Sequence, residues 1–142
     1  MALGAKGNQP WRVGIQHPRA AAPLATLELR DGEAIGTSGD YHRYFEVAGR
    51  RYCHLLDPRT AAPVQGTEAV TILIPPGTEA GMRSDALSKP LFVAGTAWRE
   101  QAQRLDVTQA LRVDAAGTVY VTPALRKRLK FETPDLKIIT VP

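Results

Sequence analysis

Gly36-Thr37-Ser38-Gly39-Asp40-Tyr41 is the first of two stretches that set this sequence apart, and the second is His54-Leu55-Leu56-Asp57-Pro58-Arg59-Thr60. Together they place hydroxyl groups, glycines, a histidine and two carboxylates around a predicted hairpin, which a purely structural hairpin would not need. A glycine beside small hydroxyl residues lets the backbone approach a phosphate group or a flat ring closely. The same residues also suit an ordinary turn with a side-chain hydrogen bond. For Thr37, Ser38 and Gly39 both interpretations therefore stay open.

The second stretch places His54 three residues before Asp57. On an extended strand this offset points the two side chains to opposite faces, so they pair only if the chain bends between them. His54 is either a satisfied residue at the edge of the core or a general base whose pKa lies near working pH. Residues 57–60 predict a type I turn.

A third stretch, Ser84-Asp85-Ala86-Leu87-Ser88-Lys89, has polar residues at helical spacing. On a helix, Asp85, Ser88 and Lys89 share one face because three- and four-residue offsets are neighbours there. A carboxylate and a hydroxyl on one face suit a hard cation such as Mg²⁺, which prefers oxygen ligands. An ordinary solvated helix face explains the same residues.

Length and composition indicate one globular domain over residues 1–142, with 44% hydrophobic and 23% charged residues. The net charge of +4 is mild. The basic cluster at 126–130 lacks the interleaved aromatics of a nucleic-acid groove, so we expect a solvated helix face and no nucleic-acid partner. Cys53 is the single cysteine and is expected to be a buried thiol. No apolar run has transmembrane length, and no signal peptide is visible.

Recurring turn signals separate short strand-like runs, and helical signals are fewer. Strands are predicted at 11–15, 27–30, 44–47, 51–55, 70–74, 119–121 and 136–141, with 70–74 central to a sheet and 44–55 forming a hairpin around Gly49. Helices are predicted from 78 to about 93, from 97 to 105, and from Pro123 to about Lys130 with Thr122 as the N-cap. We therefore expect an α+β fold with a mainly antiparallel sheet and two or three helices.

Five blocks in a fixed order resemble the FAD:protein FMN transferases, the ApbE family. The blocks are Thr37-Ser38-Gly39-Asp40-Tyr41, His54-Leu55-Leu56-Asp57-Pro58-Arg59-Thr60-Ala61-Ala62-Pro63, Val70-Thr71-Ile72, Ser84-Asp85-Ala86-Leu87-Ser88-Lys89 and Leu91-Phe92-Val93-Ala94-Gly95. The resemblance covers nearly the whole chain but only the carboxy-terminal half of such an enzyme. It implies half of a larger ApbE-like fold, and the transfer of FMN from FAD to a protein threonine with Mg²⁺.

The resemblance also assigns roles to individual residues. It implies that Asp85 is a metal ligand, that Ser88 offers another oxygen, and that Lys89 stands where the family has its metal-binding threonine. It makes His54 the base for the acceptor threonine hydroxyl. It further implies a flavin pocket whose residues on this chain are Thr37, Ser38, Gly39, Leu55, Leu56 and Thr60.

Three departures from the family pattern lead to structural predictions. Lys89 predicts an ion pair with Asp85 that takes the place of the metal, so Mg²⁺ binding is in doubt. Pro90 lacks an amide hydrogen, so the helix is expected to kink or restart there. Ala61 replaces the family's glycine, and a positive φ at this position would carry strain.

The absent amino-terminal half would supply the rest of the FAD pocket and metal ligands, so an exposed apolar face is expected. Met1 resembles an internal methionine of a longer reading frame, although a true start in a shortened protein remains open. The alternatives are an active transferase, a degenerate flavin-nucleotide-binding relative, or a structural subunit that needs a separate amino-terminal half or a second copy. The family usually acts in the periplasm or on a membrane facing it. We expect the isolated chain to be inactive.

Overall fold

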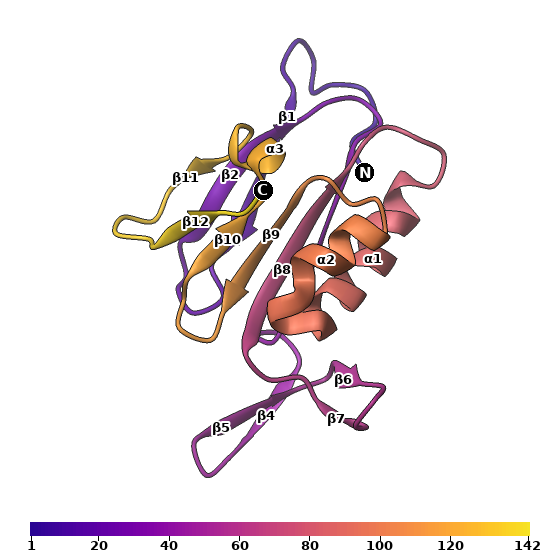
Figure 1. The fold of residues 1–142 in the computed structure, drawn as a ribbon. Coiled ribbons are helices and arrows are strands. Elements are labelled where there is room, and N and C mark those ends of the chain that lie inside the picture. The colour runs from indigo at the N-terminus through magenta and orange to yellow at the C-terminus, as the bar shows by residue number, and fades with distance from the viewer.

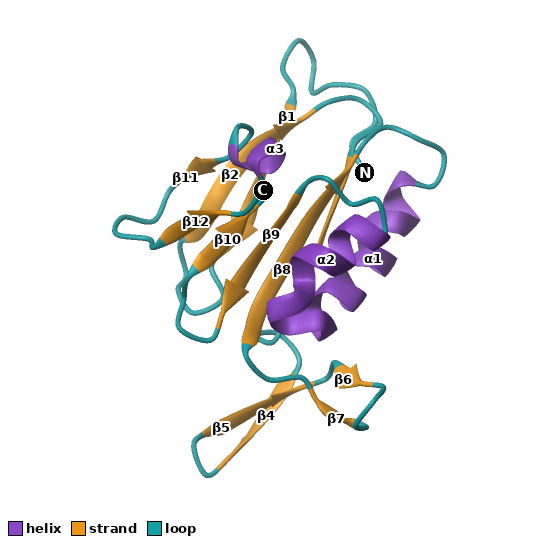
Figure 2. Cartoon of the chain, viewed as in Figure 1, coloured by secondary structure: helices purple, strands orange, loops and turns teal.

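The computed structural model describes all residues from 1 to 142, which form a five-stranded and a three-stranded β-sheet, two small hairpins and three α-helices (Figures 1 and 2). The strands are β1 Trp11–Gln16, β2 Pro23–Leu29, β3 Ala34–Gly39, β4 Tyr44–Val47, β5 Arg50–Cys53, β6 Leu56–Asp57, β7 Ala62–Pro63, β8 Thr67–Ile74, β9 Ala110–Asp114, β10 Val119–Val121, β11 Lys130–Phe131 and β12 Ile138–Thr140. The helices are α1 Ala80–Ala94, the 3₁₀ turn η1 Gly95–Ala97, α2 Trp98–Arg104 and α3 Pro123–Arg126.

Strand β8 lies inside a five-stranded sheet of order β12-β10-β9-β8-β3. Every residue of β8 is buried, and its run of β-branched and aliphatic side chains is typical of a strand that is covered on both faces. All pairings in this sheet are antiparallel except the one between β10 and β12, which is parallel. The predicted α+β class with a mainly antiparallel sheet, and the central position of residues 70–74, are confirmed.

A second sheet, of order β1-β2-β11, covers one face of the five-stranded sheet. Leu24, Leu27 and Leu29 of β2 meet Leu111 and Val113 of β9 in a shared apolar core. Helices α1 and α2 cover the opposite face, as Figure 1 shows, with a separate core of their own. Burial on both faces of one sheet therefore produces three layers: sheet, sheet and helices.

Helix α1 runs from Ala80 to Ala94 without interruption, so the predicted restart at Pro90 is wrong. Proline in a helix interior costs about 3 kcal/mol. Leu91 and Phe92 directly after it are fully buried against the sheet. Burying each such side chain contributes roughly 1.5–3 kcal/mol, which offsets the loss.

The third helix differs more from its prediction. It is confined to Pro123–Arg126, and Lys130 already belongs to β11, which pairs with β2. Thr122 does precede the helix, but its hydroxyl does not cap it. The Thr122 Oγ1 instead accepts a hydrogen bond from the Ala110 amide at 3.1 Å. Pairing with distant strands therefore overrides the local helix signal.

The segment between β3 and β8 forms an arm of two short hairpins, β4–β5 and β6–β7, at one end of the five-stranded sheet (Figure 1). We call residues 41–66 the arm. The predicted hairpin around Gly49 is confirmed, with Ala48 and Gly49 both at positive φ, as a tight two-residue turn requires. Cys53 is buried at the base of the arm, as predicted. None of the helices combines the length and the apolar character that crossing a bilayer demands.

Candidate functional site

The first of the two stretches singled out in the sequence lies on strand β3, which packs against helix α1. A β-carbon at Gly36 would overlap the carbonyl oxygen of Ser84 and approach the Asp85 amide nitrogen to 3.1 Å. Only glycine allows the strand backbone and the helix backbone to come this close. The contact brings the hydroxyl-rich stretch to the Asp85 stretch, fifty residues away in the chain.

A buried pair of hydroxyl groups continues this contact one turn further along α1. The Oγ atoms of Ser38 and Ser88 are 2.8 Å apart. Ser88 also donates to the Asp85 carbonyl at 2.9 Å, which leaves Ser38 as the donor to Ser88. The two serines therefore join strand to helix through polar groups that are satisfied within the protein.

The turn interpretation of Thr37, Ser38 and Gly39 is wrong. These residues pair in register with Thr71, Val70 and Ala69 of β8. The Thr37 hydroxyl points away from α1 and lies 2.9 Å from the Thr71 hydroxyl. Pairing with a fully buried central strand outweighs the turn preference of small polar residues.

Asp85, Ser88 and Lys89 do not present their polar atoms to a common surface. The Asp85 and Lys89 side chains are 84% and 43% exposed and form the predicted ion pair, with 2.8 Å between Nζ and Oδ1. Ser88 is 1% exposed and engaged with Ser38. Because the pair lies in solvent, it contributes on the order of 0.5 kcal/mol to stability.

These residues by themselves do not fit a Mg²⁺ ion. The one carboxylate is already neutralised by an ammonium group, and the neighbouring hydroxyl is turned into the core. No group of three His, Cys, Asp or Glu side chains that could hold a metal occurs in the structure. A hard cation with octahedral demands needs more oxygen ligands than this chain supplies here.

His54 lies on the arm and is held by Arg43. Its Nδ1 donates to the Arg43 carbonyl at 3.1 Å, so the proton lies on Nδ1 and Nε2 faces the Arg43 guanidinium at 3.2 Å. Both ring nitrogens are thus engaged, and neither bonds to β3 or α1. The structure therefore joins the first and third stretches but holds the histidine apart from them.

The turn that follows His54 is built as predicted. The Thr60 amide donates to the Asp57 carbonyl at 3.1 Å, and Arg59 pairs with the Asp57 carboxylate at 2.7 Å. Hydrogen bonds from the Arg59 side chain and amide lower the pKa of Asp57 to about 2. Ala61 follows at a φ of 54°, so the predicted strained position is confirmed.

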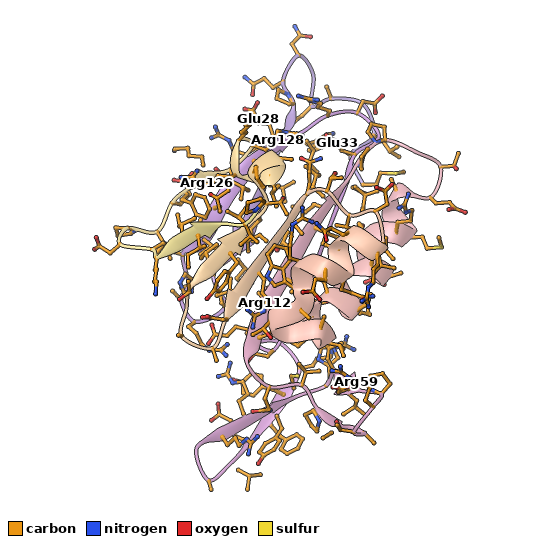
Figure 3. The ribbon with its side chains drawn as sticks, in the orientation of Figure 1. Glu28, Glu33, Arg59, Arg112, Arg126 and Arg128 are labelled. Atoms are coloured by element: carbon orange, nitrogen blue, oxygen red, sulfur yellow. The ribbon has the colours of Figure 1, made fainter.

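This turn faces helix α1 across a cavity of about 390 Å³, lined by Pro58 and Arg59 from the arm and by Lys89 and Pro90 from the helix. Figure 3 shows Arg59 on this side of the arm. Leu55 is half-buried against the helix-side core, whereas Leu56 is 55% exposed. Thr60 is exposed at the end of the turn. The third stretch therefore shares one concave surface with part of the second.

One cluster at the base of the arm was not found from the sequence. Arg19 forms two hydrogen bonds to the Asp40 carboxylate at 2.7 and 2.6 Å, and its Nε lies 3.0 Å from Glu68. Glu68 Oε2 is buried without a partner. Burial raises the pKa of Glu68, against the attraction of Arg19. Asp40 stood in the quoted stretch, but its partners come from distant segments that no local pattern indicates.

Comparison with known proteins identifies the family to which this α+β fold belongs. The ApbE family profile matches residues 1–112, and the chain belongs to the ApbE family. It is 40% identical, over 129 residues, to the FAD:protein FMN transferase of Rhodobacter capsulatus, covering 90% of this chain and 24% of that protein.

Solved structures of ApbE proteins resemble it as well. The ApbE protein of Thermotoga maritima superposes with a TM-score of 0.77 at 35% identity, over 89% of this chain and 40% of that one. The apo form of the flavinyl transferase ApbE from Pseudomonas stutzeri gives 0.67 at 35% identity, over 89% and 39%. The chain thus spans two fifths or less of these relatives.

Proposed function

We propose that this chain forms the carboxy-terminal part of an FAD:protein FMN transferase, which moves FMN from FAD onto a threonine of an acceptor protein. The observation that carries the proposal is the β3–α1 contact, where Gly36 meets Ser84 and Ser38 meets Ser88. This contact supports a nucleotide site because it places the edge strand β3, with its glycines, beside the exposed Asp85 carboxylate, while the two serines hold strand and helix together. Relatives named FAD:protein FMN transferase support the same reaction class.

Within this proposal the flavin nucleotide lies along β3 and the turn of the arm. Thr37, Ser38 and Gly39 offer it the free backbone edge of β3, and Leu55, Leu56 and Thr60 approach it from the arm. The exposed Leu56 offers an apolar surface for a flat ring.

His54 acts in this proposal as the general base for the acceptor threonine hydroxyl. A base needs a free nitrogen within hydrogen-bond reach of the proton that it takes. The Nε2 of His54 faces the guanidinium of Arg43. We therefore propose that Arg43 moves away from His54 when the substrates bind.

We propose no step through Mg²⁺, because the residues present do not fit the ion. Asp85 and Ser88 would contribute oxygen ligands only if Lys89 and Ser38 released them. The Lys89 ammonium occupies the position beside Asp85 and carries positive charge there. Positive charge beside a diphosphate stabilises it electrostatically, whether it comes from a metal or from a lysine.

The remainder of the site is proposed to come from a separate amino-terminal half or from a second copy of the chain. The chain covers only 40% and 39% of the length of the two solved relatives, which supports this proposal. So does an apolar surface cavity of about 400 Å³, lined only by hydrophobic residues, among them Leu3, Trp11, Val13 and Ile35. An apolar surface of this kind is typical of a protein–protein contact.

The experiment grafts the 142-residue chain into the Thermotoga maritima ApbE protein in place of the region that it matches. Size exclusion and a single unfolding transition first establish that the graft folds. The graft should bind FAD and make an acceptor protein fluorescent with covalent flavin, while the isolated chain should neither bind FAD tightly nor transfer FMN. A folded graft that binds no FAD contradicts the proposal. If the isolated chain binds FAD with micromolar affinity in a Mg²⁺-dependent way, the proposal that its FAD site is incomplete is contradicted.

A second candidate is a flavin-nucleotide-binding relative without turnover, which the Lys89–Asp85 ion pair favours. The matched variant is Lys89→Thr in the same graft, because threonine stands at this position in the family pattern. If the ion pair blocks the metal, the variant transfers FMN with Mg²⁺ and the unmodified graft binds FAD without transferring it. Equal transfer by both proteins shows that Lys89 was never the obstacle.

A further inference from the structure

A second cavity, of about 500 Å³, lies between the start of helix α2 and the strands β9 and β10, away from every residue assigned above to the flavin site. Its side chains include Trp98, Arg99, Arg112, Asp114 and Tyr120. Figure 3 shows Arg112 on the lower half of the five-stranded sheet, beside the helices. The volume falls in the range of small-molecule sites, which spans roughly 300–1,000 Å³.

Arg112 is the unusual residue of this cavity. It stands in the middle of β9, paired in register with Val70 and Tyr120, and is only 4% exposed. Its Nε donates to the Thr67 hydroxyl at 3.0 Å and its Nη2 donates to the Gly66 carbonyl at 2.6 Å. A guanidinium has five N–H donors, so the Nη1 amino group and one hydrogen of Nη2 have no protein acceptor.

The buried charge of Arg112 is also without a carboxylate partner, since no ion pair of the chain includes it. Burial lowers the pKa of Arg112. Attraction by the Asp114 carboxylate, and then by Tyr120, whose ring lies 5.7 Å from the guanidinium carbon, offsets this burial only in part. A buried, unpaired charge is costly, so a residue that keeps one next to a cavity is suited to pair with a ligand.

The other charges of the cavity favour an anion. Arg99 contributes a second guanidinium, and its Nε donates to the Pro142 carbonyl at 2.7 Å. Asp114 contributes the one carboxylate, and its Oδ1 accepts the amides of Ala116 and Thr118 at 2.9 and 2.8 Å. Asp114 is therefore engaged in closing its own turn. Among the side chains that line the cavity, the two guanidinium groups exceed the one carboxylate by one positive charge.

We propose that this cavity binds a small organic anion through a carboxylate or phosphate group. The oxyanion lies on Arg112 and Arg99, because a guanidinium matches the geometry of two oxygens at once. The apolar part of the ligand packs on Trp98 and Tyr120, whose rings form the wall of the cavity. The site is independent of the flavin site, so either stands if the other fails.

Trp98 provides a local probe, because it is buried at the cavity and the only other tryptophan, Trp11, lies on β1. In a Trp11→Phe background, the fluorescence of Trp98 is titrated with sodium phosphate and, separately, with sodium acetate. Sodium chloride at equal ionic strength serves as the control. A saturable change with either anion and none with chloride supports the site, and the tighter anion identifies the preferred group.

Two variants test the assigned residues, with a third as the matched control. Arg112→Met should keep the fold, since it removes an unpaired buried charge, and should abolish the saturable change. Arg99→Gln should weaken binding at least fivefold, and Arg59→Met, which removes a remote exposed arginine, should leave it unaltered. If Arg112→Met does not fold, the Arg99→Gln result decides alone. No saturable change in the parent protein, or an equal change in the parent, Arg112→Met and Arg99→Gln proteins, overturns the proposal.

Discussion

The β3–α1 contact is held by buried packing and the arm by exposed polar interactions, although both carry residues of the proposed flavin site. At the contact, Gly36 and Ser38 are fixed by close backbone approach and by a buried hydroxyl pair. On the arm, His54 and Asp57 are held by neighbouring arginines, and all four residues of β4 are exposed. The rigid half of the site therefore folds with the core, whereas the half with the proposed base depends on weak surface interactions for its position.

The largest expected effect is on the contact. Gly36→Ala places a β-carbon against the Ser84 carbonyl and should lower the free energy of unfolding by roughly 2–3 kcal/mol. Gly77→Ala is the matched control, because a β-carbon there meets nothing within 4 Å, and it should change stability by less than about 0.5 kcal/mol. Urea unfolding measures both. Equal stability of the two variants would show that the contact is not close-packed.

Glu33, just before β3, and Glu68, on β8 beside the other end of β3, should change the stability of the protein with pH in opposite directions. Burial alone would raise the pKa of Glu33. Hydrogen bonds from Arg128 and from the Arg30 amide nevertheless hold this pKa below its ordinary value of 4.5. Its contribution is present above that value and is lost as the pH falls through the lowered pKa. The raised pKa of Glu68 means that the protein loses stability as the pH rises above 4.5 through that pKa.

Glutamine variants of both residues measure this difference. Glu33→Gln should cost about 2 kcal/mol at pH 7 and less at pH 3, because a charged partner of Arg128 is lost. Relative to the parent protein, the Glu68→Gln variant should have a higher free energy of unfolding at pH 7 than it has at pH 3. Unfolding free energies at the two pH values give both signs. A change of the same sign for both variants contradicts the assignment of a raised pKa to Glu68.

A smaller effect is expected for the serine pair. Ser38→Ala or Ser88→Ala leaves one buried hydroxyl without its partner and should cost about 1–2 kcal/mol. The double variant should cost less than the sum of the two, with a coupling of about 1 kcal/mol. The Thr37–Thr71 pair, which is partly exposed, is the control and should couple more weakly. Additive serine variants would indicate that the two hydroxyls do not bond.

The smallest effect on stability is expected on the arm. Arg59→Ala should raise the pKa of Asp57 from about 2 toward its ordinary value of 3.8, because the Arg59 side chain is the main cause of the shift. The stability that this pair contributes is present above pH 3.8 and is lost as the pH falls toward 2. Solvent screens the pair, so the unfolding free energy at pH 7 should hardly change. Carbon-13 NMR of the Asp57 carboxyl follows the titration, and an unaltered pKa contradicts the assigned cause.

Much of the core was predictable, because residues 70–74 and the helix after 78 carry their own apolar patterns. Strand β3 could not be predicted, because its glycines and hydroxyl residues favour turns locally. Only the pairing with β8 holds this segment in an extended conformation. The Asp85–Lys89 ion pair was predictable since both residues lie on one helix. The Arg19–Asp40–Glu68 cluster and the buried Arg112 were not, because their partners lie far away in the sequence.

The most direct test of the proposed site is chemical shift mapping of the ¹⁵N-labelled 142-residue chain with FAD at millimolar concentration, where weak binding by half a site is still detectable. The account predicts that the largest shifts fall on residues 37–40, 54–60 and 84–89, on both sides of the β3–α1 contact. Shifts that are absent, or that gather around Arg112 and Trp98 instead, would contradict a flavin site at this place.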